Sequence, residues 1–169
     1  NLPQDRAAVQ TMHRKAITLC AGTVPTLDEN TFFCGCGDYR ASLVGNPDAR
    51  MLPFPEHMAA AFGGKAFVIT KNPDEGEIQA VLEAAAEVDR IVLGTINAHL
   101  FRSQLALAKA LAAAGKELTV VALRNPYDIP ELPDCACKIA AYDYSTPSFR
   151  ALEAVFRGGE ASGILPVKL

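Results

Sequence analysis

The sequence predicts an α/β protein, a three-layer α/β/α sandwich with a mostly parallel, doubly wound sheet of about five to six strands, flavodoxin-like or Rossmann-like in kind. Strand and helix patterns alternate along the chain with short connections, which favours right-handed crossovers and a parallel sheet. The strand segments are continuous apolar runs, a pattern typical of strands covered on both faces. The chain has 169 residues, of which 50% are hydrophobic, enough for one domain with a full core.

Five apolar runs are predicted to be the strands of this sheet. In chain order they are residues 31–36, 66–70, 90–95, 117–123 and 137–143. If the order across the sheet is 2-1-3-4-5, the first run lies near the centre and the fifth lies at an edge.

Five segments carry helical spacing of apolar residues. They are residues 4–19, 55–64, 73–88, 103–115 and 146–159, and residues 20–30 form a connector. Ser103 and Thr146 are candidate N-caps, because a side-chain hydroxyl can accept a hydrogen bond from the first turn. Gly115 and Gly158 follow the last turns of their helices, where a left-handed residue commonly ends a helix.

Charge argues against one class of partner. Sixteen Lys and Arg residues stand against nineteen Asp and Glu residues, a net charge of −3. Nucleic-acid binding needs a basic face, so we expect no nucleic-acid partner. No apolar run reaches membrane-spanning length and no signal peptide is visible, so we expect no membrane partner.

Four of the five cysteines form two C-x-C pairs, Cys34 with Cys36 and Cys135 with Cys137. Together they could supply a four-cysteine metal site. We favour packing as small apolar side chains, because residues i and i+2 share one face of a strand. We therefore expect free thiols, no metal and no cofactor. An odd number of cysteines does not suit a secreted disulfide framework and favours a cytoplasmic location.

Polar residues gather where the strands end, the edge at which parallel sheets carry their functional groups. They are Asp38, Tyr39, Arg40 and Ser42, then Lys71 and Asn72, then Thr95, Asn97 and His99, then Arg124, Asn125, Tyr127 and Asp128, and finally Asp143, Tyr144 and Ser145. Pro126 fixes the backbone of the fourth group and keeps Asn125 out of helix. This loop either packs on another surface or rims a cleft, or Arg124 and Asp128 brace it internally.

Signals for a nucleotide are incomplete. "CGCGDYR" (34–40) approaches G-x-G-x-x-G, but Arg40 replaces the third glycine and no helix pattern follows at once. A Walker loop and a G-x-S-x-G elbow are absent from the sequence. His99 has no carboxylate next to it in sequence, so we interpret it as a solitary hydrogen-bonding group at the surface. An independent small-ligand or nucleotide-binding module remains the alternative function.

Several motifs carry a family resemblance. They are G-T-x-N-A at 94–98, Q-x-A-L at 104–107, A-L-R-N-P-Y-D at 122–128, A-x-Y-x-Y-x-x-P at 140–147 and G-x-L-P-V at 163–167. Residues 88–169 resemble the C-terminal α/β-sandwich domain of glycoside hydrolase family 3, nearest to the two-domain β-N-acetylhexosaminidases of bacteria. The likeness extends more loosely to about residue 10.

The resemblance implies a role without catalytic residues. Family members do their chemistry on an N-terminal (β/α)8 barrel, with an aspartate nucleophile and a histidine acid/base in this branch. The barrel signature K-H-F-P-G-H-G is missing here, and no glutamate matches the acid/base that the sandwich lends in other branches. We therefore expect residues 1–30 to be a helix and linker leading from such a barrel and residues 31–169 to be the sandwich.

The expected partners are the barrel of the same polypeptide and a carbohydrate. The residues expected at the interface or cleft rim are Asn97, His99, Arg124, Asn125, Tyr127, Asp128, Asp143 and Tyr144. The expected function is to stabilise or shape the catalytic barrel in the hydrolysis of amino-sugar or cell-wall glycans.

Overall fold

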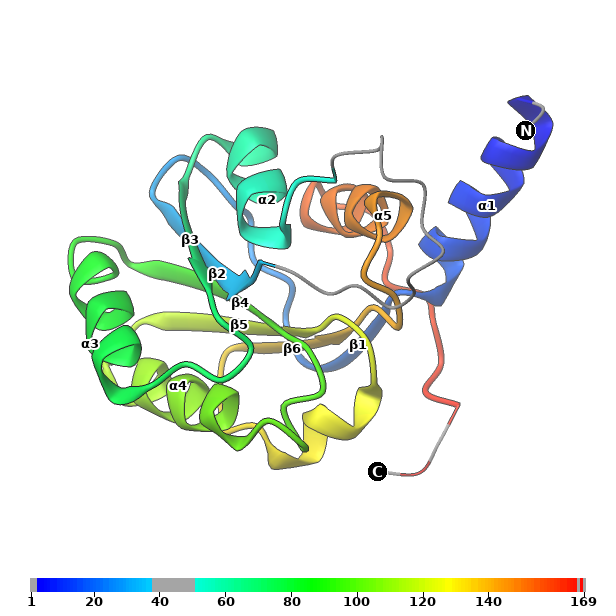
Figure 1. Ribbon diagram of the computed structural model, residues 1–169. Helices are drawn as coiled ribbons and strands as arrows, with labels where there is room; N and C mark the ends of the chain where they lie inside the picture. Colours follow the sequence, from blue (N-terminus) through cyan, green and yellow to red (C-terminus); the bar gives the residue numbers. More distant parts are fainter. Residues whose placement is uncertain (1–2, 38–50, 167, 169) are drawn as a thin grey trace.

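The computed structural model describes residues 3–37, 51–166 and 168, and its elements alternate between strands and helices as expected (Figure 1). In chain order they are α1 (Pro3–Ala16), β1 (Thr18–Gly22), β2 (Thr31–Cys36), α2 (Phe54–Phe62), β3 (Lys65–Ile69), α3 (Glu75–Ala84), β4 (Arg90–Thr95), α4 (Arg102–Ala113), β5 (Glu117–Ala122), the 3-10 helix η1 (Pro126–Glu131), β6 (Cys137–Ala140) and α5 (Thr146–Phe156).

The strands form one six-stranded sheet in the order β1-β6-β5-β4-β2-β3. Neighbours from β3 through β6 pair in parallel, whereas β1 pairs with β6 in the antiparallel sense. The five predicted runs are β2, β3, β4, β5 and β6 in chain order. They lie across the sheet in the order 2-1-3-4-5 considered above. Because all five point the same way, their carboxyl ends share one edge of the sheet.

Helices cover both faces of the sheet, which confirms the three-layer sandwich. In Figure 1, α2 and α5 lie on one side and α3 and α4 on the other, while α1 projects beside α5. The strands carry the core: Phe33, Leu93 and Val120 are fully buried on β2, β4 and β5. Among the described residues, no helix combines the length and the apolar character needed to cross a membrane.

The structure corrects three sequence predictions. Residues 18–22, read as the end of a helix and a connector, form β1, so β6 is not an edge strand. Leu19 fits the helical spacing of α1, so the sequence pattern extends the helix past its observed end. An edge strand of a few residues has too little periodicity of its own to counter that pattern. Ser103 lies inside the first turn of α4, and Ser145 rather than Thr146 caps α5 by accepting from the backbone N–H of Ser148.

Three of the four paired cysteines pack in the core as predicted, whereas Cys135 precedes β6 and is partly buried. Cys34, Cys36 and Cys137 are buried, and all five thiols are free. Burial raises the pKa of Cys36 to about 12 and that of Cys137 to about 12. Strands β4 and β5 lie between the first C-x-C pair on β2 and the second at β6.

Candidate ligand and interface site at the carboxyl edge

The loop between β4 and α4 is shaped by one asparagine and one glutamine. Asn97 has a φ of 52°, a left-handed conformation that asparagine tolerates better than most residues. The Gln104 side chain, almost fully buried on α4, accepts from the backbone N–H of Ile96 at 2.9 Å and donates to the Ile96 carbonyl at 3.1 Å. Gln104 also donates to the carbonyl of Lys71 at 3.0 Å, which ties this loop to the end of β3.

The loop after β5 turns into η1 at a proline. Asn125 has extended backbone angles and Pro126 starts the 3-10 helix, as the pre-proline restriction predicts. The next turn places Asp128 beneath the β4–α4 loop, where its side chain has no solvent exposure. A fully buried carboxylate is costly unless donors surround it, so its partners define the site.

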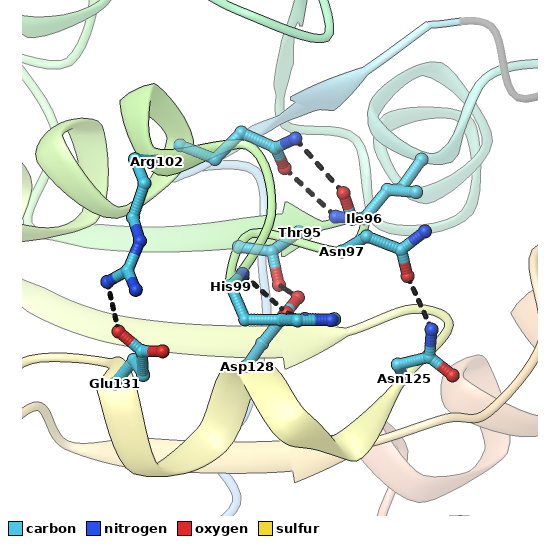
Figure 2. Close-up of polar contacts among 9 residues, drawn as sticks. Thr95, Ile96, Asn97, His99, Arg102, Asn125, Asp128 and Glu131 are labelled. Atoms are coloured by element: carbon cyan, nitrogen blue, oxygen red, sulfur yellow. Dashed lines mark hydrogen bonds and ion pairs between the residues drawn. The ribbon is translucent and has the colours of Figure 1, made fainter.

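Asp128 accepts hydrogen bonds from Thr95, the last residue of β4, and from His99 of the β4–α4 loop (Figure 2). The Thr95 hydroxyl donates to Oδ2 at 2.8 Å. The backbone N–H of His99 lies 3.0 Å from Oδ1, and the ring Nδ1 of His99 lies 2.7 Å from the same oxygen. Asp128 therefore fixes both the backbone and the imidazole of His99.

Other side chains of the same two loops lie near this histidine. The Asn125 amide donates to the Asn97 side-chain oxygen at 2.7 Å (Figure 2). The Tyr127 ring meets the His99 ring edge-on at 5.9 Å between centroids. Tyr127 is 51% exposed and Leu100 is 66% exposed, so this polar cluster has an apolar rim. Beside it, Arg102 pairs with Glu131 across α4 and η1.

The structure thus brings together five of the eight predicted site residues, Asn97, His99, Asn125, Tyr127 and Asp128. It also corrects one interpretation: His99 is not a solitary group, because Asp128 holds it from 29 positions away. Gln104 was not among the predicted site residues. A polar glutamine among the apolar positions of α4 was the feature that could have identified it.

The remaining predicted residues lie elsewhere on this edge. Arg124 is half-buried at the end of β5. Asp143 accepts from Ser145 and pairs with His13 of α1 at 3.0 Å. The residues predicted after β2 (Asp38, Tyr39, Arg40 and Ser42) lie outside the described part of the chain.

Tyr144 is buried in the core rather than at the rim. Its hydroxyl donates to the carbonyl of Cys36 at 2.8 Å and accepts from the backbone N–H of Phe54 at 3.1 Å. Phe54 also presses on β4, since a Cβ on Gly94 would lie 2.6 Å from its ring. Phe54 and Tyr144 therefore fill the carboxyl end of the sheet between β2 and β4, the switch point where doubly wound sheets bind nucleotides.

No cluster of three or more His, Cys, Asp or Glu side chains suited to a metal ion occurs among residues 3–37 and 51–166. The described groups at this edge include the His99 imidazole oriented by the Asp128 carboxylate, the Asn97 and Asn125 amides, and the Tyr127 phenol.

No family model matches the sequence, and no curated protein matches it. Solved structures do. A glycoside hydrolase family 3 β-N-acetylglucosaminidase from Paenibacillus sp. str. FPU-7 superimposes on 100% of this chain with a TM-score of 0.82 and 27% identity, over 33% of its own length.

Two more distant structures share the fold. A β-glucosidase from Listeria innocua covers 93% of this chain with a TM-score of 0.71 and 11% identity, over 25% of its length. A fungal multi-domain family 3 β-N-acetylglucosaminidase covers 95% with a TM-score of 0.69 and 18% identity, over 18% of its length. The resemblance to one domain of glycoside hydrolase family 3 enzymes is thereby confirmed, and the chain spans a third or less of these relatives.

Proposed function

We propose that this chain is the non-catalytic C-terminal domain of a family 3 glycoside hydrolase of the β-N-acetylhexosaminidase type. In this proposal it stabilises a catalytic (β/α)8 barrel in the same polypeptide and shapes its cleft. The observation that carries the proposal is the match to the Paenibacillus enzyme, which takes in the whole of this chain but only 33% of the other. The remaining two thirds of that enzyme lie outside the match, and we propose that a corresponding segment of this polypeptide carries the catalytic barrel.

The carboxyl edge is the surface we assign to the barrel. Tyr127 and Leu100 expose large apolar surfaces there, and half-buried Arg124 lies at the same edge. Tyrosine and arginine are the residue types that protein interfaces favour. The buried bonds of Asp128 and Gln104 hold the two loops in a fixed shape, which lowers the entropy cost of docking.

The runner-up, an independent nucleotide-binding module, has less support. Its ligand would enter at the switch point between β2 and β4, where Phe54 and Tyr144 already pack. The phosphate-binding loop it would need is also incomplete in the sequence, as Arg40 replaces a glycine.

The test begins with the reading frame that encodes this chain. We expect it to encode a barrel of about 200 to 400 residues before Asn1. The barrel and the 169-residue chain, produced separately, should associate in sedimentation experiments. Tyr127→Ala should weaken that association by about tenfold, since aromatic anchors dominate interfaces.

Lys65→Ala is the matched control, because Lys65 is exposed at the amino end of β3, away from the proposed docking edge. It should leave the association unchanged. A reading frame without a barrel would contradict the proposal, and so would a barrel whose association ignores Tyr127.

A further inference from the structure

The two edge strands of the sheet differ in how well they are protected from pairing with another chain. At one end, a bulge between Leu19 and Ala21 interrupts β1, and Ser162 of the C-terminal segment bridges to Thr18. Bulges and covering segments of this kind keep further strands from adding to an edge. At the other end of the sheet (Figure 1), β3 pairs with β2 in an uninterrupted parallel register, and no described strand pairs with its second side.

The backbone groups of Ala66 and Val68 point to this open side of β3. Successive residues of a strand direct their N–H and C=O groups to its two sides alternately. The carbonyl of Ile69 accepts from the N–H of Gly37, directly after β2, at 3.2 Å, so Ile69 faces β2 and so does Phe67. Ala66 and Val68 therefore face away from β2, and within the described part of the chain no hydrogen bond engages their outward groups.

The side chains make the same edge apolar. Val68 is 38% exposed and Ala66 is also exposed, while Phe67 between them is partly buried and lies 6.3 Å from Phe32 between ring centroids. Valine and phenylalanine favour strands, and the five residues of β3 include no proline. An edge with these properties is a template on which another strand can pair.

The exposed groups of β3 fit a second copy of β3. If two copies pair in the antiparallel sense with Phe67 at the twofold axis, Ala66 lies opposite the partner's Val68, and each such pair exchanges both N–H···O bonds. The same contact then forms on both copies and leaves no further edge open, which is the usual geometry of a dimer. A parallel addition would leave another free edge on every added copy.

Charge favours the same register. Lys65 would lie opposite the partner's Ile69, one residue from the end of β3. There the Glu77 carboxylate is fixed, because it accepts from the N–H of Thr70 at 2.7 Å and from the Thr70 hydroxyl at 2.6 Å. The neighbouring cation, Lys71, lies over the Phe101 ring at 4.3 Å. Lys65 forms no salt bridge among the described residues, so each copy can bring an ammonium group to the carboxylate of the other.

We propose that two copies of this chain associate through β3, antiparallel about Phe67, so that their six-stranded sheets become continuous. Strands β4 and β2 separate β3 from β5, so this junction leaves the loops after β4 and β5 free for another contact. The inference does not depend on the proposed function, and the isolated chain tests it without a barrel.

The experiment is sedimentation equilibrium of the 18.0 kDa chain, combined with amide hydrogen exchange followed by NMR. The junction is one short strand, so we expect a weak dimer with a Kd of about 10 to 100 µM. The amides of Ala66 and Val68 should exchange more slowly as the protein concentration rises through this range. The amide of Phe67, which already faces β2, should not respond.

Two variants address the edge in different ways. Val68→Lys places a charge at the junction and should raise the Kd about tenfold. Ala66→Pro removes an outward N–H that the pairing with β2 does not use, and it should raise the Kd by a similar factor of about ten. The matched control is Ala21→Lys, at an exposed position of the protected edge strand β1, which should leave the Kd unchanged. Backbone spectra establish that each variant is folded.

Three results would overturn the proposal. The first is a monomer mass at every concentration up to about 500 µM. The second is a dimer in which exchange at Ala66 and Val68 stays as fast as in the monomer. The third is a dimer that Tyr127→Ala dissociates and Val68→Lys does not, because the copies would then meet at the carboxyl edge of the sheet.

Discussion

The polar groups at the two ends of strands β4 and β5 differ in burial. At the amino end, Arg90 pairs with Glu117 at 3.1 Å and with Asp28 at 3.6 Å, and the two acidic side chains are 43% and 56% exposed. At the carboxyl end, Thr95 and His99 bind an Asp128 carboxylate with 0% exposure. The same two strands thus begin in exposed ion pairs and end in a buried network.

The two ends differ in how strongly their polar groups constrain the backbone. Exposed ion pairs contribute little to stability and tolerate changes in geometry. A buried carboxylate must keep all its donors, so it forces one conformation on the loops that supply them. The β4–α4 loop and the turn into η1 are therefore held in one arrangement by buried hydrogen bonds.

Asp128→Ala should have the largest effect. It leaves the Thr95 hydroxyl and the His99 N–H buried without an acceptor, so we expect a loss of about 3 kcal/mol in the free energy of unfolding. Glu117→Ala, the matched change at the amino end, should cost less than about 1 kcal/mol. Urea denaturation of both variants measures the difference, and equal losses would abolish the contrast between the two ends.

Gln104→Met should come next. The thioether fills a similar volume but cannot replace the bonds to Ile96 and Lys71, so we expect a loss of about 2 kcal/mol. Gln79→Met on α3 is the control, because Gln79 is exposed and donates to Glu83 on its own helix. Its cost should stay within about 0.5 kcal/mol. A Gln104 variant as stable as the Gln79 variant would show that the Gln104 hydrogen bonds do not stabilise the β4–α4 loop.

Patterns along the chain were sufficient for most of the fold. Five parallel strands followed from continuous apolar runs and helix alternation, and β2 and β4 were predicted to the residue. The order across the sheet was considered only as a condition, and the structure has that order. β1 was missed because Leu19 fits the preceding helical spacing and residues 20–22 resemble a connector, so that only the pairing with β6 identifies the strand.

The candidate site was only half predictable. Its residues could be placed at strand ends, because chain topology puts them there. The link between His99 and Asp128 could not, since it depends on how η1 turns back beneath the β4–α4 loop. Tyr144 shows the opposite error: a polar residue after a strand looked exposed, yet its hydroxyl bonds to backbone groups in the core.

Cys36, the last residue of β2, provides a test of burial at the carboxyl end of the sheet through the pH dependence of stability. Burial raises the pKa of its thiol from 9.0 to about 12. Above pH 9 the unfolded chain releases this proton while the folded chain keeps it, so stability falls as pH rises, by about 1.4 kcal/mol per pH unit until the folded thiol ionises. Unfolding measured at pH 8, 9, 10 and 11 should show a shallower decline for Cys36→Ala. Parallel declines would mean that Cys36 is more accessible than the structure indicates.

Arg124→Ala should have the smallest effect on the isolated chain. If Arg124 serves docking, its removal should change the unfolding free energy by less than about 0.5 kcal/mol and should lower the thermal stability or activity of the barrel-containing polypeptide. Lys65→Ala should do neither. A clear drop in the melting temperature of the isolated chain would assign Arg124 to bracing the loop instead. A variant silent in both proteins would leave Arg124 with neither role.

The most direct test of the central claim is an activity measurement on the pure 169-residue chain with p-nitrophenyl N-acetyl-β-glucosaminide. Both the nucleophile and the acid/base are proposed to lie on a separate barrel, so no nitrophenol should be released above the background rate. His99→Gln should behave like the unmodified chain. Turnover that survives further purification would contradict the account, and its loss in His99→Gln would assign the activity to the edge described here.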